Sequence, residues 1–196
     1  MSNILETDGE RLLSALRGVL AAKGIAMPAE IAERIAQTDE ATPARGARMV
    51  ARAWCDPSFR ALMLADGARA AESMGVPMRG APPLGVLENT TDTHHLVVCT
   101  LCSCYPRAVL GYPPFWFKSA AYRARAVRDP RGLLTEWGTV LPDHVRIRIV
   151  DSTADYRWMV LPRRPAGTEG WSEDRLAAIV REGDMIGVTV PALPAT

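Results

Sequence analysis

Apolar residues recur at helical spacing in the first part of the chain. Five of them between positions 12 and 20 share one face of a helix, and this pattern stops at Gly24. The residues of this face are Leu12, Leu13, Leu16, Val19 and Leu20. Pro28 and Pro43 stand where helices begin, and Thr42 is a candidate N-cap before the second proline. A further helix is expected over residues 56–75.

Short strands appear from residue 84 onwards. Residues 84–88 and 95–98 read as strands, so the segment after residue 98 begins directly at a strand end. Apolar and arginine residues alternate over 145–149, which predicts a half-buried strand, and residues 156–161 are its expected neighbour. The other predicted elements are helices over 119–127 and 131–137, a helix capped by Ser172, and a last strand over 185–190 stopped by Pro191. The pattern as a whole predicts an α+β fold.

Composition and charge exclude several classes of protein. The 196 residues are enough for one real core with a small appendage. The net charge of +1 provides no basic surface for nucleic acid, and no apolar run is long enough to cross a membrane. The N-terminus lacks the charged and apolar regions of a secretory signal. We therefore expect a cytoplasmic protein with no nucleic-acid or membrane partner.

Three of the four cysteines lie within six residues, at positions 99, 102 and 104. Thiolates are soft metal ligands, and only one residue separates Cys102 from Cys104. A metal bound by both sulfurs would lie over the intervening backbone, where the amide nitrogens of Ser103 and Cys104 can complete a plane once deprotonated. Cys99 can then add an axial sulfur and leave one position open. The spacing therefore favours a functional metal site.

Two other interpretations of the cysteines remain open at this point. One is a structural zinc site with His94 or His95 as the fourth ligand, although the one-residue gap strains a tetrahedral geometry. The other is a disulfide or a set of redox thiols. The remaining cysteine, Cys55, is distant in a predicted helix, so the cysteines form no regular secreted framework and indicate a reducing compartment.

The flanking residues resemble a known family, the alpha subunit of nitrile hydratase, which includes the gamma subunit of thiocyanate hydrolase. The resemblance extends over roughly the last 110 residues and is not confined to one motif. The matching runs are 88–90, 97–106, 109–111, 113–114, 118–119, 122–125, 147–148, 151–152, 159–162, 164–171 and 185–188.

The resemblance implies a role for each residue of the cysteine segment. The metal would be a low-spin trivalent cobalt, one per subunit, held by the axial thiolate of Cys99, the sulfurs of Cys102 and Cys104, and the backbone nitrogens of Ser103 and Cys104. Cys102 would be oxidised to a sulfinate and Cys104 to a sulfenate. Thr100 matches the cobalt branch of the family, so iron is less expected, and zinc is expected only in an immature or isolated subunit.

The resemblance also implies a fold and partners. Residues 76–196 would form the catalytic domain, an α-β-β-α sandwich with antiparallel or mixed sheets, and residues 1–75 would form a helical arm that contacts a beta-type subunit. Arginines of that partner would bind the oxidised cysteines, and a cobalt-insertion activator protein is expected. Arg123 and Arg125 either lie on a solvated helix face or brace the interface near the metal.

The chain departs from the family at two places. Arg107 stands where nitrile hydratases usually carry tryptophan, and arginine is typical of the thiocyanate hydrolase branch. Arg107 and Tyr105 are therefore candidate substrate-pocket residues, with pairing to an acidic partner group as the alternative for Arg107. Near residues 80–82 the usual Gln-Gly-Glu run is replaced, which removes a glutamine that supports the oxidised cysteines.

The implied activity is hydration of a nitrile to an amide, with Cys102, Ser103 and Cys104 as the catalytic group. Arg107 motivates a second possibility, hydrolysis of thiocyanate, since a cation suits a small anionic substrate. A bulky nitrile such as the nucleoside antibiotic toyocamycin is a third. A non-enzymatic, zinc-stabilised module is the alternative from a different class of protein.

Overall fold

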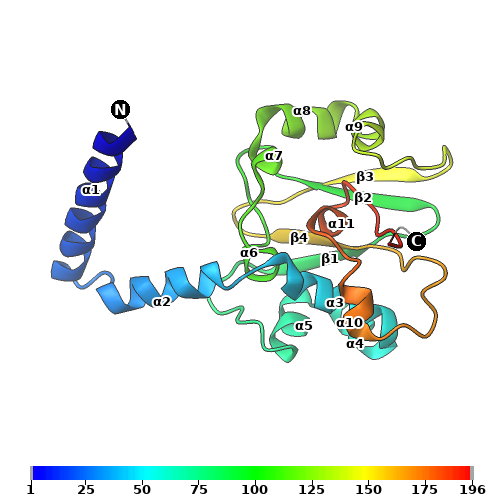
Figure 1. Cartoon of the computed structure of the whole chain (residues 1–196), viewed down its shortest axis with the longest axis horizontal. Helices are drawn as coiled ribbons and strands as arrows, with labels where there is room; N and C mark the ends of the chain where they lie inside the picture. The colour runs from blue at the N-terminus through cyan, green and yellow to red at the C-terminus, as the bar shows by residue number, and fades with distance from the viewer. Residues whose placement is uncertain (1, 195–196) are drawn as a thin grey trace. The chain divides into compact units, whose positions relative to one another are not determined.

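The computed structural model describes residues 2–194, and the chain divides into two compact units between Glu40 and Ala41. The first unit holds helices α1 (Ser2–Ala22) and α2 (Pro28–Asp39) (Figure 1). Helix α1 ends just before the predicted stop at Gly24, and α2 begins at Pro28 as predicted. The apolar face of α1 is exposed, with 72% of Leu12 accessible to solvent. The boundary at residue 75 and the partner contact of the arm stay predictions.

The second unit confirms the α+β class and its layers. Helices α8 and α9 lie on one side of the β2–β3 pair, and α3, α4, α5 and α10 lie on the other side of the β1–β4 pair (Figure 1). The elements are α3 (Pro43–Cys55), α4 (Pro57–Ala65), α5 (Gly67–Ser73), β1 (Leu84–Glu88), β2 (Thr93–Val98), α6 (Arg107–Leu110), α7 (Phe115–Lys118), α8 (Ala120–Arg128), α9 (Pro130–Glu136), β3 (Arg146–Asp151), β4 (Arg157–Leu161), α10 (Glu173–Ala177) and α11 (Glu182–Ile186). Within residues 2–194, no helix is long and apolar enough to cross a bilayer.

The strand pairing differs from the prediction in partner and in direction. β1 pairs with β4 and β2 pairs with β3, and both pairs are parallel. The expected pairing of β3 with β4, and the expected antiparallel or mixed sheets, are therefore wrong. β3 lies beside β2 along its whole length. The pairing continues one residue beyond β3, where Ser152 N donates to Val98 O at 2.7 Å. Apolar alternation marks a strand but carries no information about its neighbour.

The helix predicted over residues 56–75 is two helices. Asp56 caps α4 by accepting from Ser58 N and Phe59 N, and Asp66 interrupts the helix in an extended conformation and caps α5 through Arg69 N. The interruption brings Gly67 against β1, where a β-carbon on Gly67 would lie 2.6 Å from Leu84 O. Close packing of α5 on β1 therefore depends on this break.

The segment predicted as the last strand, residues 185–190, forms no strand. Residues 187–190 make a turn, and Met185 and Ile186 are the last two residues of α11. The N-terminus of α11 is held by Asp184, whose carboxylate accepts from Arg181 N at 2.8 Å and from the hydroxyl of Thr189 at 2.5 Å. Met185 and Ile186 are fully buried. A short apolar run of this kind is compatible with either a strand or a buried helix, and tertiary packing decides between them.

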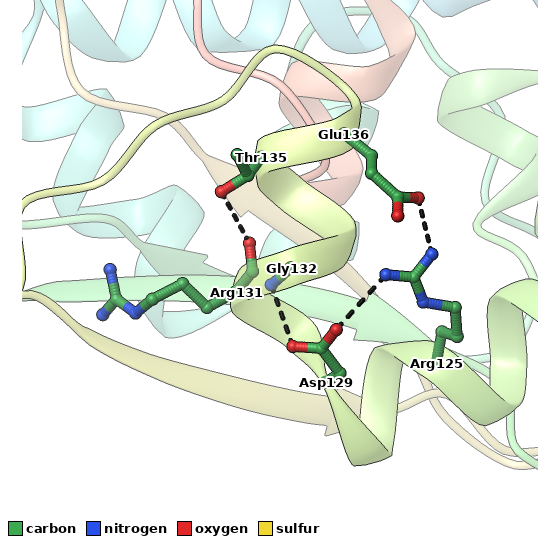
Figure 2. A network of polar contacts seen from close by, with 6 residues as sticks. All are labelled: Arg125, Asp129, Arg131, Gly132, Thr135 and Glu136. Atoms are coloured by element: carbon green, nitrogen blue, oxygen red, sulfur yellow. Dashed lines mark hydrogen bonds and ion pairs between the residues drawn. The ribbon is translucent and has the colours of Figure 1, made fainter.

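The junction of α8 and α9 fixes the layer that covers β2 and β3. Figure 2 shows Asp129 accepting from Gly132 N at 3.0 Å and pairing with Arg125 at 3.2 Å, while Arg125 also donates to Glu136 at 2.5 Å. On the inner face of α8, the Tyr122 hydroxyl donates to Val97 O at 2.7 Å. Helix α8 is thereby fastened to β2 immediately before the cysteine segment.

We expect Gly187→Ala to be among the most destabilising single substitutions in the chain. Gly187 has a φ of 84°, and a β-carbon there would lie 1.9 Å from His95 O, so backbone must move. The free energy of unfolding should fall by about 3–5 kcal/mol in urea titrations. Gly170→Ala is the control, because Gly170 has a φ of 74° but open space around it, and it should cost only about 1 kcal/mol. Equal losses for both variants would contradict the backbone clash.

Candidate metal centre

The cysteine segment is a loop between the end of β2 and the start of α6. Cys99 follows the last residue of β2 directly, so the buried end of this strand fixes its position. Cys99 and Cys104 are buried, at 1% and 8% exposure, whereas Cys102 is exposed. Cys55 is exposed and lies at the end of α3, outside this group. The loop thus presents one accessible thiol over two buried ones.

The three sulfur atoms converge. The Sγ atom of Cys102 lies 3.5 Å from that of Cys99 and 3.2 Å from that of Cys104, and all three lie within 4.8 Å of one another without a disulfide. The backbone N–H of Cys102 donates to Cys99 Sγ at 3.2 Å. A single ion can be reached by all three sulfurs, so the donor set fits a metal that takes thiolates. We refer to residues 99–104 as the claw.

The claw thiols differ in how readily they ionise. Hydrogen bonds from Cys104 and from Cys99 lower the pKa of Cys102, whereas burial raises the pKa of Cys104 to about 12, with Arg157 opposing that rise. Cys102 therefore loses its proton more readily than Cys104, whose deprotonation would accompany metal binding. Loading of the claw should release protons and be favoured by higher pH.

Asp151, at the end of β3, holds the front of the claw. Its Oδ1 atom accepts from Thr100 N at 3.0 Å, and its Oδ2 atom accepts from the Thr100 hydroxyl. On the other side, the guanidinium of Arg123 on α8 donates to Thr100 O at 3.4 Å. The parallel pairing of β2 with β3 places Asp151 opposite Val98, beside the claw. The backbone between Cys99 and Cys102 is thus held from two elements.

We expect Asp151→Asn to weaken metal binding. Asparagine removes the negative charge, so the hydrogen bond from Thr100 N loses its charge assistance, and the Thr100 hydroxyl must change from donor to acceptor. Affinity measured by competition with a chelator should fall about 10–100-fold, the range for groups that orient a metal ligand. Asp155→Asn is the matched control, since Asp155 is exposed on the following turn. Equal affinity for Asp151→Asn and the control would show that the contact does not support the claw.

The structure places the other predicted site residues at different depths. Ser103 is half-buried within the claw. Tyr105 is buried, its ring meets Phe117 edge-on at 4.9 Å, and its hydroxyl donates to Glu182 at 2.5 Å. Arg107 is exposed at the start of α6, with its guanidinium 5.5 Å from the centre of the Tyr112 ring. Arg107 therefore reaches solvent. The buried Tyr105 would affect a substrate only indirectly, by fixing the position of neighbouring residues.

His94 and His95, the candidate zinc ligands, lie outside the cysteine group. His94 is 3% exposed, and burial lowers its pKa, so the neutral ring donates from Nε2 to Gly187 O at 2.7 Å and accepts at Nδ1 from Asn89 at 3.1 Å. The adjacent His95 is only half-buried, because successive side chains of a strand point to opposite faces. Among residues 2–194, the metal-competent group holds three cysteines and no histidine.

Three residues near the claw, Asp151, Arg157 and Glu182, escaped prediction, whereas Arg123 was a candidate for bracing the region near the metal. Asp151 and Arg123 belong to runs that matched the family, but their contacts with Thr100 had no local signal. Arg123 and Arg157 each keep a buried guanidinium nitrogen with no hydrogen-bond partner among the described residues. Glu182 lies 77 positions beyond Tyr105 and had no signal in the sequence.

Fold and site together define an α+β protein with three converging thiols, a group suited to a metal, at the end of a strand. The family model described as nitrile hydratase, alpha chain, matches residues 7–189. The chain belongs to this family.

Particular relatives agree with this assignment. The low-molecular weight cobalt-containing nitrile hydratase subunit alpha of Rhodococcus rhodochrous is 53% identical over 156 residues, 80% of this chain and 75% of that one. The thiocyanate hydrolase subunit gamma of Thiobacillus thioparus is 46% identical over 160 residues, 76% of this chain and 66% of that one.

Solved structures of both kinds of enzyme share the fold. A recombinant thiocyanate hydrolase with partially modified cobalt centres superposes with a TM-score of 0.87 at 41% identity, covering 94% of this chain and 90% of that one. A double histidine-to-alanine mutant of the iron-type nitrile hydratase from Comamonas testosteroni has a TM-score of 0.84 at 39% identity, covering 97% and 96%. Because cobalt and iron proteins share this fold, the fold alone does not select the metal.

Proposed function

We propose that this chain is the metal-bearing alpha subunit of a cobalt-type nitrile hydratase, which adds water to a nitrile to form an amide. The observation that carries the proposal is the convergence of the Cys99, Cys102 and Cys104 sulfurs within 4.8 Å at a strand end. Cobalt is favoured by Thr100 and by the cobalt-containing relatives. An iron or zinc centre is the alternative outcome of metal analysis.

The claw residues would hold trivalent cobalt through the three sulfurs and the backbone nitrogens of Ser103 and Cys104. When bound, the ion supplies Lewis-acid chemistry that activates the nitrile or a water molecule. Exposure of Cys102 leaves one side of the claw accessible to substrate, while the buried Cys99 and Cys104 anchor the other. The chain's part in catalysis is thus to position the sulfurs and to keep one side open.

Oxidation of two sulfurs belongs to the same proposal. A sulfinate at Cys102 corresponds to addition of both atoms of one dioxygen to the thiolate. A sulfenate at Cys104 corresponds to transfer of one oxygen atom from a peroxide to the thiolate, with release of water. The exposure of Cys102 supports its greater oxidation, because an oxidant reaches this sulfur more easily than the buried Cys104.

A beta-type partner subunit is expected to complete the site. Exposed apolar residues lie in the claw and just after it, with Leu101 at 88% and Phe115 at 91% exposure. The face of α1 that carries Leu12 is also exposed. Surfaces of this composition are typical of subunit interfaces. We propose that both regions contact the partner, that an activator protein inserts the cobalt, and that the free cysteines reflect a reducing, cytoplasmic setting.

Co-expression with the neighbouring subunit genes in cobalt medium tests the proposal. We expect amide formation from nitriles, cobalt in the assembled enzyme, and one and two added oxygen atoms on the claw peptide in mass spectra. The panel should include small nitriles, a bulky nitrile such as toyocamycin, and thiocyanate. Zinc bound to three unmodified cysteines in an active assembly would overturn the assignment.

Thiocyanate hydrolysis is the second candidate function, favoured by the exposed cation of Arg107 beside the claw. In that reaction thiocyanate and two waters give carbonyl sulfide, ammonia and hydroxide. If Arg107 binds this anion, Arg107→Met should lower kcat/KM for thiocyanate about 10–100-fold, the value of a charge-assisted hydrogen bond. Nitrile hydration should change far less.

Arg128→Met is the control for Arg107, because Arg128 is an exposed arginine at the end of α8. It should leave both activities unchanged. Formation of amide with no carbonyl sulfide, before and after substitution of Arg107, would restrict the function to nitriles.

A further inference from the structure

A second carboxylate reaches the claw from a segment near the end of the sequence. Glu182, the first residue of α11, accepts a hydrogen bond from the Tyr105 hydroxyl at 2.5 Å. Tyr105 follows Cys104 directly, so the contact fixes the residue bonded to a claw ligand. Asp151 holds Thr100 in the front half of the claw. Two carboxylates from β3 and α11 therefore hold the claw at opposite ends.

Tyr105 is restrained at its ring as well as at its hydroxyl. Only 2% of it is exposed, and its ring lies edge-on to the fully buried Phe117 at an interplanar angle of 69°. A buried phenol that loses its acceptor costs free energy, because water cannot replace the partner. Glu182 is half-buried, and burial raises its pKa. The pair is thus a desolvated contact rather than a surface one.

The element that carries Glu182 is itself fixed to the core. Asp184, fully buried two residues later, binds Arg181 N and the Thr189 hydroxyl, and Met185 and Ile186 are fully buried. The acceptor therefore occupies a defined position relative to β2, from which the claw begins. Because Tyr105 is bonded to Cys104 through the backbone, holding the Tyr105 hydroxyl in place also restrains the position of Cys104.

We propose that Glu182 is a positioning residue of the metal centre, which sets the placement of the Cys104 sulfur through the hydroxyl of Tyr105. The inference rests on the proposed function, in which the claw binds a metal. Without the contact, the Cys104 side of the claw is free to move away from Cys99 and Cys102. Metal release should then become faster, and the buried Cys104 thiol should become accessible to reagents.

A double-mutant cycle on the full chain, assembled with its partner subunit, tests the pair. Glu182→Leu and Tyr105→Phe should each speed cobalt release to a chelator about 10–100-fold and alter the visible sulfur-to-metal absorption. The double variant should be no worse than either single variant, because both remove one contact. Glu182→Gln keeps an acceptor oxygen and should restore release to near the wild-type rate. Glu173→Leu, on the exposed start of α10, is the control and should behave as wild type.

Alkylation of the metal-free full chain gives a readout that is independent of the bound ion. Iodoacetamide should modify Cys104 about tenfold faster in Glu182→Leu than in wild type, with the exposed Cys55 as the internal reference. The inference would be overturned if Glu182→Leu released cobalt at the wild-type rate, kept the wild-type absorption spectrum and showed the wild-type rate of Cys104 alkylation. Additive effects in the double variant would overturn it as well. A wild-type assembly that binds no metal would instead refute the proposed function.

Discussion

Cys104→Ser is expected to abolish activity in the assembled enzyme, with a loss of at least about 1000-fold. The substitution replaces a sulfur donor by a hydroxyl that a soft metal binds poorly and that cannot be oxidised to a sulfenate. Loss of a ligand should exceed the 10–100-fold effect of losing a group that only orients one. The measurements are nitrile hydration, metal content, and the visible sulfur-to-metal absorption, which should shift or disappear.

The chain supplies a matched control for this experiment. Cys55→Ser makes the same atomic change at an exposed thiol outside the claw, and it should leave activity and spectrum unchanged. A Cys104→Ser enzyme that stays active with an unaltered spectrum would refute the role of this residue as a ligand.

Supplying zinc in place of cobalt should lower activity at least about 100-fold and leave the claw cysteines unoxidised. Zinc has no redox chemistry and prefers a tetrahedron, so it does not favour binding by deprotonated backbone amides within the claw. Activity assays, metal analysis and mass spectra of the claw peptide measure the outcome. Purification under identical conditions in cobalt medium provides the reference.

Thermal unfolding separates this effect from simple misfolding. The zinc and cobalt preparations should have similar melting temperatures, because the fold rests mainly on fully buried residues such as Leu96 and Met159 rather than on the claw. Full activity with zinc and unmodified sulfur would exclude a cobalt mechanism for this chain.

Local signals were sufficient for most elements of the fold. The strand predicted over 84–88 is β1, and the alternation over 145–149 falls largely within β3. The helix after Ser172 begins where a capping serine precedes acidic residues. The interruption at Asp66 was missed, although aspartate is a strong N-cap, because an apolar pattern continued through it. The strand predicted over 185–190 failed because a short buried run has no periodicity of its own.

The sequence pattern could not predict which strands pair, and the reason is physical. β1 and β4 are far apart in the chain, as are β2 and β3, and parallel pairs of this kind need long connections. Which strands meet is decided by burial of both faces and by packing of the helices between them. Neither quantity is local.

The chemistry of the site is the property that the sequence determined by itself. Cys99, Cys102 and Cys104 are so close along the chain that their sulfurs can share one ion in a compact loop, and the structure places them within 4.8 Å. Tertiary structure decided which thiol is exposed and what holds the claw. The bonds from Thr100 to Asp151 and from Tyr105 to Glu182 join residues 51 and 77 positions apart, so they exist only once strands and helices have packed.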